Sequence, residues 1–230
     1  MTFLKVSGNR KTIMLNVMIV VLAAALLAKL LYDEKKTNAS RRLLFKVLLS
    51  SLFVMAILTQ PHHIRRYYQC LLAGLIFCMG GDICLAVPRG KMFLAGLVSF
   101  LLGHIFYILG FFHVTNPGMW TWAGSIVVLF ISTGIYFRLK SHLGAMNIPV
   151  LFYIAVISVM LSGAWSVFVD SGLTLSGRMM VVSGALFFYI SDLFVARNRF
   201  LKKEFFNRLI GLPLYYTGQF ILAFSVGVLK

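Results

Sequence analysis

Residues 78–87 read CMGGDICLAV and residues 187–196 read FFYISDLFVA, two strongly apolar stretches that each contain one aspartate, Asp82 and Asp192. A carboxylate at membrane depth is costly unless it is paired, protonated or facing a polar cavity. An aspartate inside such a stretch is therefore a candidate functional residue. Two of them make a candidate pair, with a structural hydrogen-bonded role as the simpler alternative.

The composition of the whole chain is that of an integral membrane protein. Of the 230 residues, 60% are hydrophobic and only 12% are charged, whereas soluble domains carry about 25% charged residues. A chain of this length accommodates roughly eight spans of about 20 residues joined by short loops. We expect an all-α, polytopic membrane helical bundle that forms a single integral membrane domain over residues 1–230.

Apolar runs bounded by charges or prolines predict where these helices lie. The first run is too long for the apolar core of a typical signal peptide, so we expect it to be a retained span. In the fourth run Gly96, Gly103 and Gly110 recur every seven residues and form a stripe that favours close helix packing. The eight expected spans cover about residues 13–32, 43–60, 67–87, 92–112, 119–137, 148–169, 179–197 and 207–229.

The net charge of +16 is distributed as in a membrane protein. Nearly all 22 Lys and Arg residues fall between the apolar runs, where anionic lipid headgroups are their natural counter-charge. Most of them lie on one side of an eight-span arrangement. The positive-inside rule then places both termini away from the cytoplasm and the aspartates toward it. The basic loops fit a bacterial inner membrane, and we expect membrane lipids rather than nucleic acid as partners.

The alternation of sides places the two aspartates at one depth. The third and seventh expected spans run in the same direction, and each aspartate lies about five residues before the end of its span, roughly 8 Å from the boundary at about 1.5 Å per residue. Other polar residues fall in the same layer. Together they predict a polar cavity that opens to the cytoplasmic leaflet, with Lys46, Tyr153, Tyr189, Tyr215, Tyr216 and Gln219 in its wall.

Several of these residues have alternative interpretations. Lys46 is placed where a long basic side chain snorkels to the interface, and Tyr215 and Tyr216 fit an interfacial aromatic belt. His104 lies near mid-bilayer, where it either hydrogen-bonds another helix or reaches the floor of the cavity. Glu204 lies in the basic run LKKEFFNR, so we expect a solvated partner of its neighbours.

The three cysteines, Cys70, Cys78 and Cys84, lie in one apolar segment without a CxxC spacing or a histidine partner pattern. Such spacings are typical of zinc sites. We therefore expect reduced, structural cysteines and neither a metal nor a cofactor.

Five stretches spread from the second span onward resemble the YhhN-like lysoplasmalogenase family of eight-span membrane hydrolases. They are FKVLLS (45–50), GLIFCMGGDICLAVP (74–88), FLAGLVSFLLGHIFYI (93–108), GALFFYISDLFVARNRF (184–200) and LPLYYTGQFILAFSV (212–226). The family usually has a proline after the lysine of the first motif, where this chain has Val47.

The resemblance implies hydrolysis of the vinyl ether bond of 1-alkenyl lysophospholipids to a fatty aldehyde and a glycerophospho-headgroup. That reaction needs one acid and one base and requires no metal. We expect Asp82 and Asp192 to share these roles. Lys46, together with Arg197 at the end of the seventh span, is expected to hold the substrate phosphate, while the alkenyl chain extends into an apolar slot between helices.

Three other functions use the same features. A proton-coupled transporter would employ the buried aspartates as a proton relay, but it needs polar groups at both membrane faces, and the outer halves of the third and seventh spans contain few. An intramembrane aspartyl protease has the motif GxGD, whereas Met79 stands in place of the first glycine. A non-catalytic lipid-binding or scaffold protein is the third.

Overall fold

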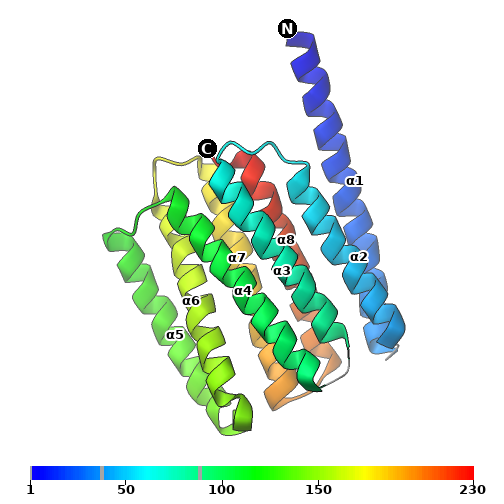
Figure 1. The fold of residues 1–230 in the computed structure, drawn as a ribbon, viewed down its shortest axis with the longest axis vertical. Helices are drawn as coiled ribbons and strands as arrows, with labels where there is room; N and C mark the ends of the chain where they lie inside the picture. Colours follow the sequence, from blue (N-terminus) through cyan, green and yellow to red (C-terminus); the bar gives the residue numbers. More distant parts are fainter. Residues whose placement is uncertain (1, 37–38, 88–89) are drawn as a thin grey trace.

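The computed structural model describes residues 2–36, 39–87 and 90–230, and its helices form an elongated bundle (Figure 1). The α-helices of the described residues are α1 (Thr2–Lys35), α2 (Ala39–Leu58), α3 (Arg65–Ala86), α4 (Gly90–Val114), α5 (Met119–Leu143), α6 (Asn147–Val169), α7 (Leu175–Ala196) and α8 (Phe205–Val228). A 3-10 turn, η1 (Gly144–Met146), joins α5 to α6, and a π-helical turn, η2 (Arg197–Leu201), follows α7.

Each of the eight expected apolar runs coincides with one α-helix, which confirms the all-α class. Two details of the prediction were wrong. The fifth helix does not end near residue 137, because Leu139 and Leu143 continue it and pack against Val150 of α6. We also expected all five prolines of the chain to lie at or near helix ends, but Pro213 lies inside α8.

The apolar helices make the protein a polytopic membrane bundle. Six segments of the described residues are long and apolar enough to cross a membrane, and one of them, Met119–Val169, contains both α5 and α6. α2 is not among the six, and it carries three cations near its start, Arg41, Arg42 and Lys46. The count of eight spans stays a prediction.

Five helices form a ring around the interior of the bundle. α3 packs against α4, α4 against α6, α6 against α7, α7 against α8, and α8 against α3. α2 packs on α3 and α8, α5 packs on α6, and α1 lies at the periphery against α2 and α8 (Figure 1). Both termini lie at the same end of the bundle, and α3 and α7 both run toward the opposite end (Figure 1).

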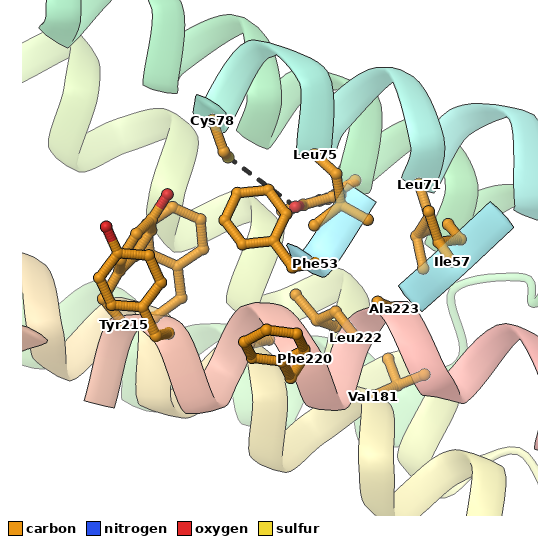
Figure 2. Close-up of a cluster of buried hydrophobic side chains, with 14 of the residues drawn as sticks. Phe53, Ile57, Leu71, Leu75, Cys78, Val181, Tyr215, Phe220, Leu222 and Ala223 are labelled. Carbon is orange, nitrogen blue, oxygen red and sulfur yellow. Dashed lines mark hydrogen bonds between the residues drawn. The ribbon is translucent and has the colours of Figure 1, made fainter. Parts of the chain in front are cut away.

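An apolar cluster holds α2, α3, α7 and α8 together. In lipid such packing, rather than the removal of apolar surface from water, is what favours helix association. Tyr215 and Cys78 lie at one end of this cluster, where polar groups begin (Figure 2). The cluster itself includes Phe53, Ile57, Leu71, Leu75, Val181, Phe220, Leu222 and Ala223, whose side chains gather between the helices (Figure 2).

Glycines set the closest helix contacts. The predicted stripe of Gly96, Gly103 and Gly110 faces α3, which confirms its role in packing. A methyl group added to Gly103 would lie 2.8 Å from the sulfur of Cys78 and 3.1 Å from the carbonyl oxygen of Gly74. The backbones of α3 and α4 therefore approach too closely for any side chain at this position.

We expect Gly218→Ala to destabilise the bundle by about 1–3 kcal/mol, the usual cost of overpacking. The added methyl would lie 2.8 Å from the backbone carbonyl oxygen of Gly184, so α7 and α8 would have to separate. Gly134→Ala is the matched control, because a methyl there meets nothing within 4 Å. Unfolding of the purified variants in detergent measures the difference, and equal stability of the two would contradict the assigned contact.

Candidate functional site

The two aspartates lie at the same level of the bundle. Asp82 is four residues before Ala86, the last residue of α3, and Asp192 is four residues before Ala196, the last residue of α7. The two helices run in the same direction (Figure 1). Both aspartates line one cavity between the helices.

This cavity contains about 1090 Å³ of space free of protein atoms, including the part that is open to the outside. Its wall is predominantly apolar, with a small number of polar side chains, which is typical of ligand sites. Residues of α2 through α8 and of η2 contribute to the wall. The polar and charged wall residues are Lys46, Asp82, Tyr153, Tyr189, Ser191, Asp192, Asn198, Asn207, Arg208 and Tyr215.

Asp82 is held by two hydroxyl groups from different helices. Ser50 of α2 donates a hydrogen bond of 2.5 Å and Tyr215 of α8 donates one of 2.8 Å, both to Oδ2 of Asp82. The side chain is almost fully enclosed, because Asp82 is only 2% exposed. This carboxyl group therefore joins α3 to both α2 and α8.

Asp192 is held in the same manner by the other half of the ring. The hydroxyl of Tyr153 on α6 donates a hydrogen bond of 2.6 Å to Oδ2 of Asp192. Nε2 of His104 on α4 lies 3.0 Å from that hydroxyl oxygen and 3.5 Å from the carboxyl oxygen. The side chain of Asp192 is 17% exposed, so it is more accessible from the cavity than Asp82.

The hydrogen bonds around Asp192 have a defined direction. The hydroxyl of Tyr153 donates its hydrogen bond to Asp192, so its oxygen accepts one from His104. The hydrogen bonds therefore run from His104 through Tyr153 to the carboxylate. Nδ1 of His104 is buried without a hydrogen-bond partner among the described residues. We therefore assign a ring proton to Nε2, which donates the hydrogen bond to Tyr153.

Aromatic rings connect the two aspartate networks. The rings of Tyr215 and Phe188 are 5.3 Å apart, and Phe188 lies 4.5 Å from the ring of His104. Phe100 contacts both Tyr215 and Phe188 edge to face. This packing fixes the position of one carboxyl group relative to the other.

The structure places Lys46, Tyr153, Tyr189 and Tyr215 in the cavity wall. Lys46 is only 3% exposed, so it does not snorkel to the surface of the bundle. The hydroxyl of Tyr189 forms a hydrogen bond of 2.7 Å with Ser132 of α5.

Three other expected residues lie behind the wall rather than in it. His104 is fully buried and reaches the cavity only through Tyr153 and Asp192. The ring of Tyr216 is buried beside Tyr215, 4.9 Å between centroids. Gln219 is buried and accepts a 2.6 Å hydrogen bond from Tyr107.

Arg197, the expected second phosphate ligand, is not among the wall residues. Its guanidinium donates hydrogen bonds of 2.5 Å to Asn207 and 2.9 Å to Glu204. Glu204 is thus a partner of its basic neighbours, as expected. The hydrogen bond from Lys202 and the charge of Arg197 hold the pKa of Glu204 below its usual value.

Arg208 and Ser50 are site residues that the sequence interpretation missed. Arg208 ends the basic run LKKEFFNR and begins the expected eighth span, and we assigned it no role in the site, yet it lines the cavity. A signal was available, because Arg208 precedes Tyr215 by seven residues and Ser50 follows Lys46 by four. Both spacings place the two residues on one face of a helix.

Cys70, Cys78 and Cys84 are free thiols. Within the described residues, no group of three His, Cys, Asp or Glu side chains is arranged to hold a metal ion.

We expect Tyr215→Phe and Tyr153→Phe each to lower the free energy of unfolding by about 1 kcal/mol, because each removes a buried hydrogen bond to a carboxyl group. Tyr32→Phe is the control, since Tyr32 is 49% exposed at the periphery. Unfolding curves in detergent provide the measurement. Stability of both site variants equal to that of the Tyr32→Phe control would contradict the network.

These features define a multi-pass membrane protein with an internal cavity that carries two aspartates. Residues 41–226 match the YhhN family model, and the chain belongs to the YhhN family.

Among curated proteins, the chain is similar to lysoplasmalogenase TMEM86A of Homo sapiens, with 32% identity over 67% of this chain and 64% of the relative. Lysoplasmalogenase TMEM86A of Bos taurus is 28% identical over 74% of this chain and 68% of its own length. Lysoplasmalogenase TMEM86B of Mus musculus is 31% identical over 67% of this chain and 62% of its own length. The chain thus spans slightly less than two thirds of the human TMEM86A. No solved structure matches the chain.

Proposed function

We propose that this protein is a lysoplasmalogenase-type hydrolase. It cleaves the vinyl ether bond of 1-alkenyl lysophospholipids and releases a fatty aldehyde and glycerophosphoethanolamine or glycerophosphocholine. The observation that carries the proposal is the presence of two aspartates at one level in the wall of a single, mostly apolar cavity. Membership of the YhhN family and the names of the similar proteins support it.

The reaction requires a proton donor and a group that activates water. Protonation of the β-carbon of the vinyl ether produces an oxocarbenium ion at the α-carbon. Water adds to that carbon and loses a proton, which gives a hemiacetal. The hemiacetal then breaks its bond to the glycerol oxygen, which takes up a proton and leaves as the alcohol, while the other fragment leaves as the aldehyde.

Asp82 and Asp192 share the acid and base roles in this proposal. Their surroundings differ, because Asp82 is enclosed by two hydroxyl donors and lies near Lys46, whereas Asp192 is more accessible and is held by Tyr153. Carboxyl groups in different environments can hold different protonation states at one pH. One can therefore deliver the proton while the other accepts one from water.

We expect Asp82→Asn and Asp192→Asn each to lower turnover by about 10²–10⁴-fold, the usual contribution of general acid–base catalysis. Turnover is measured as the rate of aldehyde release from 1-alkenyl lysophosphoethanolamine by the purified protein in detergent. Asp170→Asn is the matched control, since Asp170 lies in the loop after α6 and caps Gly172 there. Near-normal turnover in both folded site variants would refute the proposal.

Lys46 is proposed to bind the substrate phosphate. Its replacement by Gln should raise KM more than it lowers kcat, because the contact is made in the ground state and in the transition state alike. Lys140→Gln, at the exposed end of α5, should leave both constants unchanged. If Lys46→Gln lowered kcat and left KM unchanged, Lys46 would instead take part in the chemical step.

The cavity is proposed to open toward the cytoplasmic side of a bacterial inner membrane. Arg197, Arg199, Lys202 and Lys203 follow α7 directly, at the end of the bundle where the aspartates lie (Figure 1). Such a concentration of cations is typical of cytoplasmic loops.

A proton-coupled transporter is the second candidate, and one observation favours it. Polar contacts continue along the core beyond the cavity, from Cys78 to Tyr107, from Tyr107 to Gln219 and between Tyr67 and Ser225. The outer half of the bundle is therefore less featureless than the sequence indicated. Proton flux in proteoliposomes that disappears in Asp82→Asn, without any aldehyde release by the wild type, would select this function.

A further inference from the structure

We propose that Lys46 and Arg208 form a subsite for the phosphodiester of a single-chain glycerophospholipid. The lipid lies with its headgroup between α2 and α8 and with its chain against α4, α5 and α6. The inference rests on the proposed function in placing the bond to be cleaved beside the aspartates and in taking one of the two carboxyl groups as protonated.

Lys46 and Arg208 face the same cavity from two adjacent helices. Lys46 lies on α2 and Arg208 on α8, and these helices pack against each other. The charge of Lys46 interacts with those of Asp82 and Arg208. Within the described part of the chain neither cation forms an ion pair. The two glutamates that do form ion pairs bind Arg42, Arg197 and Lys202 instead. Two cations in a mostly apolar wall repel each other, and the charge of Asp82 offsets only one of them, so an anionic ligand beside both is favourable.

The charge balance of the cavity selects the kind of anion. The wall carries two cations, Lys46 and Arg208, and two carboxyl groups. Acid catalysis requires one carboxyl group to be protonated, which leaves one positive charge in excess. A phosphodiester carries one negative charge and neutralises this excess. A phosphomonoester carries about −1.5 to −2 near neutral pH, and a neutral glyceride carries none, so both fit less well.

The spacing along the helices fits a glycerol unit. Lys46 precedes Ser50 by four residues and Arg208 precedes Tyr215 by seven, and both hydroxyl groups bind Asp82. At about 1.5 Å per residue, the two cations lie roughly 6 and 10 Å from the level of Asp82 toward the start of their helices. Five bonds along the glycerol backbone separate the ether oxygen from the phosphorus, a span comparable with the smaller of these two separations, and the long side chain of Arg208 can cover the remainder of the larger one. A phosphate at the cations therefore places the vinyl ether near the carboxyl groups.

The opposite wall of the cavity suits the hydrocarbon chain. It is built of Phe93 and Leu97 from α4, Ile135 and Leu139 from α5, and Val150 and Ile154 from α6. The cavity is thus charged where α2 meets α8 and apolar between α4, α5 and α6. A single-chain phospholipid has the same division between headgroup and chain.

The test is direct binding of 1-O-alkyl lysophosphoethanolamine, whose saturated ether has no double bond to protonate. We expect Arg208→Gln to weaken its affinity for the purified full-length protein about tenfold or more, the value of a charge-assisted contact. Arg208→Lys should keep most of the affinity. Arg138→Gln, at the exposed end of α5, is the matched control and should leave it unchanged.

Two further ligands separate the headgroup from the chain. Neutral 1-O-alkylglycerol should bind wild type and Arg208→Gln equally, and chain-free glycerophosphoethanolamine should bind wild type more weakly than the alkyl lipid. The subsite would be overturned if Arg208→Gln weakened binding of the neutral lipid as much as binding of the phospholipid. It would also be overturned if Arg208→Gln left the affinity for the phospholipid unchanged. Equal affinity for the chain-free headgroup and the alkyl lipid would overturn the placement of the chain.

Aldehyde release distinguishes failure of the subsite from failure of the proposed function. If wild type releases no aldehyde but phospholipid binding depends on Arg208, the hydrolase function fails and the phosphodiester subsite stands. If wild type releases aldehyde with unchanged KM in Arg208→Gln, the hydrolase function stands and the subsite is wrong.

Discussion

The architecture of the site depends on one constraint, that a carboxyl group in a membrane interior must be hydrogen-bonded. Each aspartate meets it with side chains from two other helices. Asp82 on α3 binds Ser50 of α2 and Tyr215 of α8, and Asp192 on α7 is held by Tyr153 of α6, with His104 of α4 behind it. The same bonds that satisfy the carboxyl groups therefore tie the helices of the ring together around the cavity.

Glycine contacts join the helix pairs that these hydrogen bonds do not bridge. Gly103 allows close backbone contact between α3 and α4, and Gly218 allows it between α7 and α8. The apolar cluster of Phe53, Leu75 and Leu222 fills the bundle beyond the polar site (Figure 2). Apolar packing thus dominates the level beyond the cavity, which also contains the hydrogen bonds from Tyr107 to Gln219 and between Tyr67 and Ser225.

Part of the site was predictable because depth follows from sequence position. Once the spans and their alternation are assigned, Asp82, Asp192 and Tyr215 fall into one layer. Which side chain faces the cavity is a different question, because it depends on how each helix is rotated. Arg197 and Arg208 lie close together in the sequence, yet Arg197 binds Asn207 and Glu204 while Arg208 lines the cavity. Counting residues from a span end could not separate them.

The sequence by itself determined the membrane-embedded all-helical class, the helix positions and the level of the two aspartates, because the hydrophobic length of a span and the alternation of sides are local properties of the chain. Only the tertiary structure decided that Ser50 and Tyr215 hold Asp82, that His104 hydrogen-bonds Tyr153, and that Arg208 and Lys46 line the same cavity. Those contacts link residues far apart in the chain, and they exist because the packing of the ring fixes the rotation of every helix.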